Sequence, residues 1–235
     1  MTVGTQKRLG FSAIGGRKAK AEKIAAILAA AGSPLKPGDQ LLDRGCGSGE
    51  IAAQLATRAR VICCDAIDQR TQGVDLPFTA VGVTLPFANA SFDVVVSNHV
   101  IEHLPDAAIH VAEIRRVLRP GGIAYLATPN RWWPWEFHTR LPLLHFLPTE
   151  LFSPIGRHLG RLDEPLQLLS LRRLRQLTRT HFAIDVWHTR ILHAPTDYAL
   201  NISPAIAAVL RALPQPLLDA SAGLQPTLIL VLRIR

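Results

Sequence analysis

Cysteine is scarce in this chain of 235 residues, which has three, two of them adjacent at Cys63 and Cys64. Such a set provides neither a disulfide framework nor the ligand spacing of a zinc site. The sequence therefore excludes the class of small domains held together by disulfides, and we expect reduced thiols in a hydrophobic core.

Long hydrophobic runs are also missing. No apolar run in the sequence approaches the roughly 18–20 residues that span a membrane. The segment from Met1 to Lys20 carries charges and glycines without the apolar core of a signal peptide. We therefore expect a cytoplasmic protein with no membrane span, for which peripheral membrane contact stays open. The length suits one α/β domain with insertions.

Lysine is absent beyond Lys36, and every later basic residue is an arginine. The net charge is +8 with a sequence pI near 10.1, which suits nucleic acid, an anionic membrane or a phosphorylated substrate without choosing among them. The arginines form no concentrated patch in the sequence, so we do not expect nucleic acid. The segment from Leu151 to Arg190 contains seven arginines and three acids, and this excess of positive charge suits an anionic acceptor or lipid headgroups.

The most informative stretch runs from Leu41 to Glu50, with the sequence LLDRGCGSGE. It predicts a short strand, a turn with three alternating glycines and a helix that begins near Ile51. Glycines adopt backbone angles that other residues avoid, and they let a ligand approach where a Cβ would block it. The following helix offers unpaired N–H groups at its start. We expect a ligand to lie against this backbone.

Two acids accompany the glycines. Asp43 lies two residues before Gly45, and Asp65 ends a second strand over 60–64. An acid about twenty residues after the first glycine suits the hydroxyls of a nucleoside ribose. The dinucleotide fingerprint needs a third glycine where this chain has Glu50, so a nicotinamide cofactor is disfavoured. The pattern acid–x–Gly–x–Gly–x–Gly instead resembles motif I of the class I S-adenosylmethionine (SAM) methyltransferases.

A second stretch, LPFANASFDVVVS from Leu85 to Ser97, resembles the type 11 group of this family. The resemblance implies an α/β fold: a three-layer Rossmann-like sandwich around a mostly parallel seven-stranded sheet, with an antiparallel last strand and lid insertions. We expect an N-terminal helical cap over 1–36 and a methyltransferase domain over 37–235. The lid insertions are expected at about 131–169 and 193–224.

The resemblance implies SAM as the cofactor. In this family the acid before the glycines faces the cationic end of SAM, and the acid after the second strand binds the ribose. Where many relatives place an acid near the adenine, this chain has 81–84, so backbone groups and apolar packing would bind the adenine. The residues expected at the cofactor are Asp43, Gly45, Cys46, Gly47, Gly49, Asp65, Thr84, Leu85, Ser97 and Asn98.

The segment from His99 to His103 reads HVIEH, which matches the inverted zinc-protease signature. A strand leads directly into it and Pro105 shortens any helix, so zinc hydrolysis is disfavoured. Some quinone O-methyltransferases of the family hold a divalent metal at similar positions, but His99 stands where a carboxylate is wanted, and we expect no metal. Glu102 and His103 are expected to fix the loop over the sheet edge.

The acceptor site is expected after the fifth strand, where three of the four tryptophans lie within four residues. Aromatic rings there can stack on a flat or apolar acceptor or close the core under a lid. The apolar segment 141–159 that follows predicts a lid or an interfacial surface. The candidate catalytic bases are His99 and His138, and the candidate acceptor-binding residues are Trp133, Trp135, Glu136 and His138.

These patterns predict a SAM-dependent methyltransferase that acts on an oxygen or nitrogen of a small, apolar or lipid-like metabolite. Neither an Asn-Pro-Pro-aromatic motif nor a Pro-Cys nucleophile follows the fourth or fifth strand, which disfavours nucleic acid. Two alternatives stay open, an RNA-directed methyltransferase and a non-catalytic SAM-binding protein. Arg44 would indicate the latter if its charge faced the sulfonium.

Overall fold

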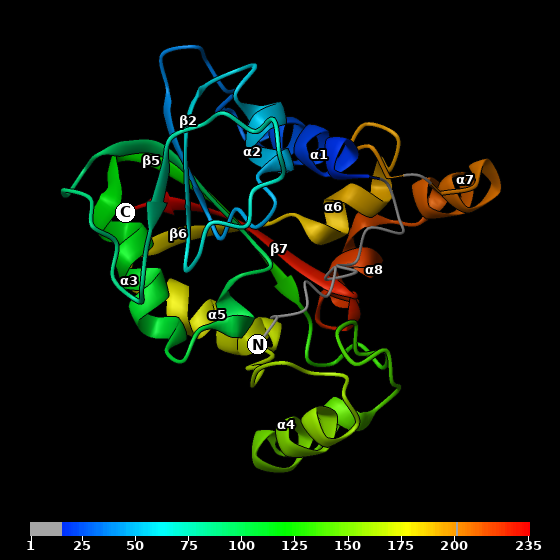
Figure 1. Ribbon diagram of the computed structural model, residues 1–235. Coiled ribbons are helices and arrows are strands. Elements are labelled where there is room, and N and C mark those ends of the chain that lie inside the picture. Colours follow the sequence, from blue (N-terminus) through cyan, green and yellow to red (C-terminus); the bar gives the residue numbers. More distant parts are fainter. Residues whose placement is uncertain (1–15, 201) are drawn as a thin grey trace.

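A seven-stranded sheet forms the centre of the molecule, in a computed structural model that describes residues 16–200 and 202–235 (Figure 1). The strand order is β3-β2-β1-β4-β5-β7-β6. The strands are β1 (Gln40–Arg44), β2 (Arg60–Asp65), β3 (Phe78–Ala80), β4 (Phe92–Asn98), β5 (Leu118–Pro129), β6 (Phe182–Val186) and β7 (Thr227–Ile234).

Strands β1 to β5 pair in parallel, whereas β7 runs antiparallel to both β5 and β6. The order turns back between β1 and β4, and open α/β sheets bind ligands at the carboxyl ends of strands at such a point. The expected mostly parallel sheet with an antiparallel last strand is therefore confirmed.

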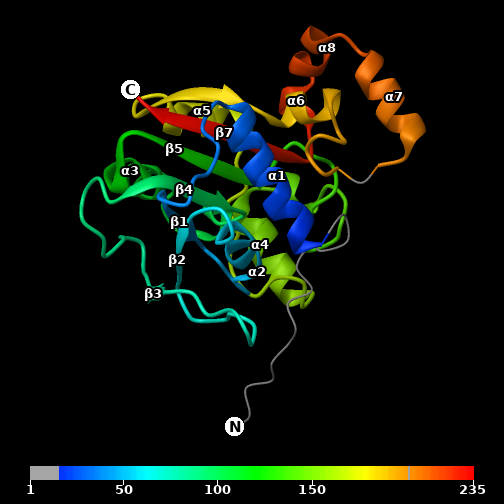
Figure 2. The ribbon, with the colours of Figure 1, turned by 90° about the horizontal axis from the view of Figure 1, so that it is seen from above.

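Helices cover both faces of the sheet (Figure 1). Helices α1 (Arg17–Ala30), α2 (Glu50–Leu55) and α6 (His188–His193) pack on one face, onto which Figure 2 looks, and α3 (Ala107–Val117) and α5 (Leu171–Thr178) pack on the other. The buried strand residues alternate between these two cores because successive side chains of a strand point to opposite faces. Leu41 lies in the first core and Leu42 in the second.

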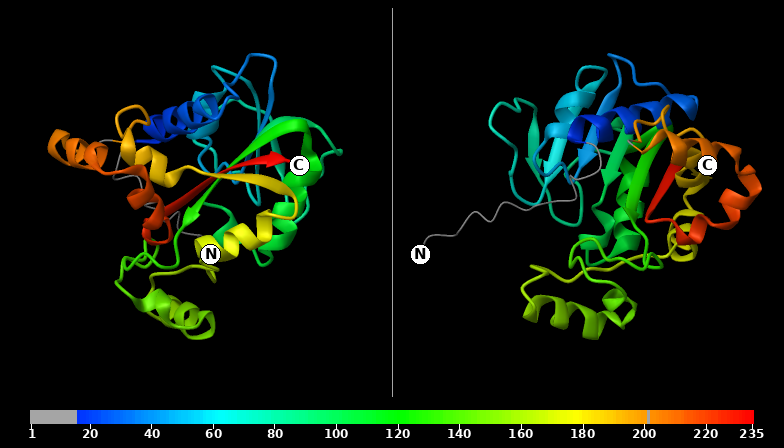
Figure 3. Two further views of the ribbon diagram at one scale, coloured as in Figure 1. Left: turned by 180° about the vertical axis from the view of Figure 1, so that it is seen from behind. Right: turned by 90° about the vertical axis from the view of Figure 1, so that its right-hand side faces the viewer.

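The insertions contain more helix than the sequence pattern indicated. The first holds the 3-10 turn η2 (Leu144–Phe146) and α4 (Thr149–His158), which stands apart from the sheet in both views of Figure 3. The second holds α7 (Pro204–Ala212), α8 (Gln215–Ala220) and the turn η3 (Ala222–Leu224). Within the described residues no helix combines the length and apolar character needed to cross a membrane. The expected boundaries of cap and lids stay predictions, and residues 1–15 of the cap lie outside the described part.

Candidate functional site

The three glycines after β1 all have positive φ, and they differ in what surrounds them. A Cβ on Gly45 would lie 2.3 Å from Cγ2 of Val100, so this glycine is required by packing. At Gly47 (φ +52°) nothing lies within 4 Å of the position of a Cβ. The turn therefore presents bare backbone at Gly47 to open space, as expected for a loop that holds a ligand.

The acid at the end of β2 holds this glycine turn. The backbone N–H of Gly47 donates to Oδ2 of Asp65 at 2.8 Å, and Oδ1 accepts from the N–H of Ala66 at 2.7 Å. The predicted ribose-binding acid and the predicted glycine loop therefore form one unit.

The acid before the glycines lies beside them on the face that α1 covers. Asp43 is 3% exposed, and no described residue donates a hydrogen bond to its carboxylate. Burial, with added repulsion from Asp65, raises the pKa of Asp43 to about 7, although Arg17 acts in the opposite direction. Arg17 also joins the first turn of α1 to Glu50 at 3.0 Å, and this contact places α1 beside the glycine turn.

Arg44 points to the opposite face of the sheet from Asp43. Its Nη2 donates to the carbonyl of Val83 at 2.9 Å, and the side chain is 2% exposed. On the neighbouring strand β4, the residue paired with Arg44 is Ser97. The Oγ of Ser97 lies 2.9 Å from Nε2 of the buried His110. Burial, and then the charge of Arg44, lower the pKa of His110 well below its ordinary value. The charge of Arg44 therefore does not face the expected position of the sulfonium. Such an orientation was the feature that would have indicated a non-catalytic protein.

Ser97 and Asn98 differ in what they offer the crevice. Because the hydroxyl of Ser97 is turned toward α3, only its backbone is available to a cofactor, whereas Asn98 is half-buried at the end of β4. Both remain predicted cofactor residues.

Charged side chains hold the loop between β3 and β4 by its backbone. Oε2 of Glu113 accepts from the N–H of Leu85 at 2.6 Å, and Arg116 donates to the carbonyl oxygens of Leu85 and Phe87 at 2.8 and 2.7 Å. The ion pair with Arg116 holds the pKa of Glu113 at about 2. The backbone of Leu85 is thus fully engaged, whereas Gly82 and Thr84 of the predicted adenine loop are exposed.

Sequence reasoning missed this network of Arg44, Glu113 and Arg116. A charged pair three residues apart on α3 was visible in the sequence, but such pairs are ordinary on helix surfaces. The partners lie 28 to 39 residues away along the chain, so only the packing of α3 against the loop reveals their role.

The carboxylate of Glu102 is the centre of a second group of titratable side chains. Glu102 is fully buried in the turn η1 (Ile101–His103), and its Oε2 accepts from Oγ1 of Thr128 at 3.0 Å. Nδ1 of His99 lies 3.4 Å from its Oε1. Glu102, His103 and His138 each offer a ligand atom, all within 4.8 Å of one another. The structure thus brings His99 and His138 to one carboxylate.

His138 is held by Glu136. Its Nδ1 lies 2.7 Å from Oε1 of Glu136, and Oε2 accepts from the N–H of Thr139 at 2.5 Å. Burial lowers the pKa of His138, but the bond to Glu136 and the charges of Glu136, Glu102 and Glu164 outweigh it, so its pKa lies above the ordinary value. Because Nδ1 faces the carboxylate, Nε2 is the nitrogen left to accept a proton.

The tryptophans after β5 are not core residues. Trp132 and Trp135 are 52% and 46% exposed, and Trp133 is half-buried. Leu151, Ile155 and Leu159 of the following segment are also exposed, at helical spacing. An exposed apolar surface of this kind is typical of a ligand-binding or interaction site. Whether these residues form a lid stays a prediction.

Comparison with known proteins agrees with the motifs. Residues 42–126 match a family model described as a methyltransferase domain. The chain is 43% identical over 101 residues to a probable S-adenosylmethionine-dependent methyltransferase of Mycolicibacterium smegmatis, covering 40% of this chain and 39% of that protein. It is 37% identical over 109 residues to a ubiquinone biosynthesis O-methyltransferase of Sinorhizobium fredii, covering 42% and 44%. The chain thus matches less than half the length of these relatives.

A solved structure supports the same fold. The phosphoethanolamine N-methyltransferase 2 of Haemonchus contortus, in complex with S-adenosyl-L-methionine, superposes with a TM-score of 0.58. The two are 18% identical, and the match covers 97% of this chain and 55% of that one. At this identity the likeness concerns the fold.

Proposed function

We propose that the protein is a class I SAM-dependent methyltransferase, which transfers the methyl group of SAM to an oxygen or nitrogen of a small apolar metabolite. The observation that carries the proposal is Asp43, a buried carboxylate to which no described residue donates a hydrogen bond, beside a glycine turn that is open to a ligand. An ionised buried carboxylate needs a cationic partner.

SAM fits these residues. Its cationic end would lie against Asp43 and its ribose against Asp65. The protein backbone of Gly45, Cys46, Gly47 and Gly49 would contact the cofactor between them. The adenine would lie near Thr84, Leu85 and Asn98. When bound, SAM supplies an activated methyl group on a sulfonium. The chain's own residues hold donor and acceptor in line and exclude water, and positioning of this kind can supply much of a rate enhancement.

His138 is the proposed base for an acceptor that arrives as a hydroxyl or an ammonium. Glu136 orients its ring and stabilises the imidazolium that forms, as an acid does for a catalytic histidine. His99 is the second candidate base because it lies at the end of β4 beside Glu102. Trp133 and Trp135 would contact the acceptor.

We propose that neither Mg²⁺ nor Ca²⁺ takes part. The cluster at Glu102 offers one carboxylate among its three donors, whereas Mg²⁺ and Ca²⁺ prefer oxygen ligands. Nδ1 of His138 is engaged by Glu136, and Nδ1 of His103 lies 3.0 Å from Oε1 of Glu164. Both histidines of the cluster therefore already have a carboxylate partner within the protein.

The decisive experiment is transfer of label from methyl-labelled SAM to a metabolite extract, followed by identification of the product. Labelled small molecules that disappear with the Asp43→Asn variant support the proposal. Label in RNA would favour the RNA-directed alternative. SAM binding without transfer to any fraction would favour a non-catalytic binding protein.

A further inference from the structure

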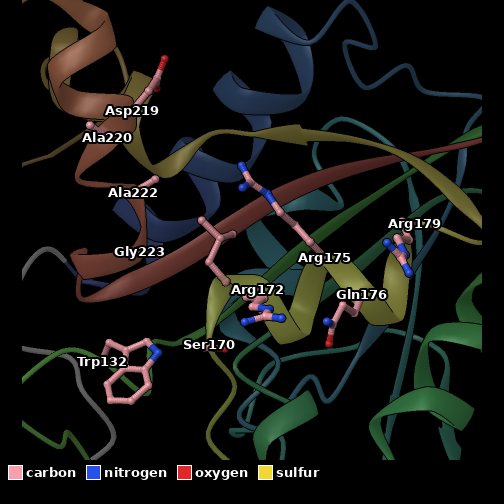
Figure 4. A pocket seen from close by; sticks show the side chains of 11 residues that line it. Trp132, Ser170, Arg172, Arg175, Gln176, Arg179, Asp219, Ala220, Ala222 and Gly223 are labelled. Carbon is pink, nitrogen blue, oxygen red and sulfur yellow. The ribbon is translucent and has the colours of Figure 1, made fainter.

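A cavity of about 670 Å³ opens between α5 and the segment from α8 to η3, with Trp132 at its rim (Figure 4). Small-molecule sites commonly have volumes of this size. Its lining comes from elements that carry none of the predicted cofactor residues, and it includes Arg172, Arg175, Arg179 and Asp219.

The three arginines have no carboxylate partner among the described residues. They lie at spacings of three and four on α5 and just after it, so they share one side of the helix. Asp219, the acid of the lining, is engaged elsewhere, because its Oδ1 accepts from Oγ1 of Thr189 at 2.7 Å and from Gln215 at 2.9 Å.

This arrangement is unfavourable for the helix itself. Like charges three or four residues apart repel each other. Arg172 and Arg173 also occupy the first turn of α5, which holds no acid, and there the helix dipole disfavours cations. A sequence that breaks local rules in this way commonly does so at a functional site.

The opposite wall of the cavity is fixed before any ligand arrives. Nδ2 of Asn130 donates to the carbonyl oxygens of Gly223 and Gln225, both at 2.8 Å. Nε2 of His188 lies 2.9 Å from the carbonyl oxygen of Ala222. Walls that are ordered in advance reduce the entropy that a ligand loses on binding.

We propose that this cavity binds an anion of the phosphate class, with Arg172, Arg175 and Arg179 as its partners. The planar guanidinium group matches the oxygens of a phosphate in pairs. The exposed indole of Trp132 at the rim suits a flat or apolar group on the same ligand. The anion belongs either to a free phosphorylated metabolite or to a lipid headgroup.

The test titrates the full chain with pyrophosphate by calorimetry, without SAM. Wild type should bind saturably, and Arg172→Gln with Arg175→Gln should weaken binding at least tenfold. Arg58→Gln with Arg60→Gln is the matched control, because it removes the same charge from exposed positions outside the cavity and outside the segment from Leu151 to Arg190, and it should change binding less than twofold. Absence of saturable binding, or equal weakening in both double variants, would overturn the proposal.

Two further arms identify the source of the phosphate. Sedimentation with vesicles that contain phosphatidic acid, lost in the cavity variant and kept in the control, indicates a lipid headgroup. Binding of pyrophosphate without vesicle binding indicates a free metabolite. SAM affinity of the cavity variant should stay within twofold of wild type, which shows an intact fold. Because no arm measures methyl transfer, the result does not depend on the proposed activity.

Discussion

The backbone N–H of Gly47 donates a hydrogen bond to the carboxylate of Asp65 at 2.8 Å. One acid therefore holds the glycine turn, and its proposed second task is to offer its charge to a ribose. The bond crosses from the turn after β1 to the end of the neighbouring strand β2, so sequence spacing alone did not indicate it.

Replacement of Asp65 should separate these two tasks. Asp65→Ala removes both and should weaken SAM binding by about 2–4 kcal/mol, since a hydrogen bond to a charged group contributes roughly 1.5–3 kcal/mol. Asp65→Asn keeps an acceptor for the N–H of Gly47 and should lose less. Calorimetric titration measures both, and unchanged affinity in the alanine variant would reject the ribose assignment.

Gly47→Ala should weaken SAM binding at least tenfold, because the new methyl group would enter the space that the cofactor needs. The positive φ adds a folding cost of about 1–2 kcal/mol. Gly32→Ala is the control, since Gly32 has φ +79° and the same open surroundings after α1. Its thermal stability should fall similarly while SAM affinity is kept. Retained binding in Gly47→Ala would mean that the turn does not contact the cofactor.

SAM affinity should rise with pH as Asp43 ionises. The pKa of Asp43 is raised to about 7 by burial and Asp65, so below that pH binding of a cation must first release a proton. Affinity should then increase up to about tenfold per pH unit between about pH 6 and 7. Asp43→Asn should bind weakly with little dependence on pH in this window. A flat profile for wild type would contradict the assignment.

The same raised pKa has a consequence for folding. In the folded protein Asp43 keeps its proton to a higher pH than in the unfolded chain, where the pKa is about 3.9. Its contribution to stability is therefore lost as pH rises from about 4 to 7. Unfolding by urea at both pH values should show a smaller decline for Asp43→Asn than for wild type.

Once an acceptor is known, kcat/KM should rise with pH through an apparent pKa above about 6.5, the ordinary value for histidine. The cause is that Glu136 and nearby acids raise the pKa of His138. Glu136→Gln should move this limb to lower pH and reduce turnover, whereas His138→Gln should abolish the limb. Chelation with EDTA should leave the rates unchanged. A limb unaffected by both variants would transfer the role to His99.

Trp133 and Trp135 should serve the acceptor and not the cofactor. Replacing both by alanine should keep SAM affinity within about threefold and lower turnover at least tenfold, about 1.4 kcal/mol of barrier. A membrane role predicts instead that wild type pellets with anionic liposomes, that the double variant does not, and that turnover of a dispersed acceptor is unaffected. Equal loss of cofactor binding and turnover would reject both roles.

Local pattern determined the strands, the glycine turn and the helix α3, because each depends on residues that are neighbours in the sequence. The antiparallel β7 was expected from the family resemblance alone, because the direction of a strand in a sheet depends on how the elements pack and not on local pattern. Helices α6 and α8 were not predicted, because each has six residues and too few apolar positions to show a period.

Tertiary structure decided what the polar residues face. Strand alternation already turns Arg44 away from Asp43, but only the packing of the loop against the sheet gives it the carbonyl oxygen of Val83, 39 residues away, as a partner. Tertiary structure also brought His99 and His138 to the buried carboxylate of Glu102, although the two histidines are far apart in the chain. It also left Arg172, Arg175 and Arg179 at a cavity with no carboxylate partner among the described residues. Burial and pairing of charge depend on distances between elements, which no spacing in the sequence contains.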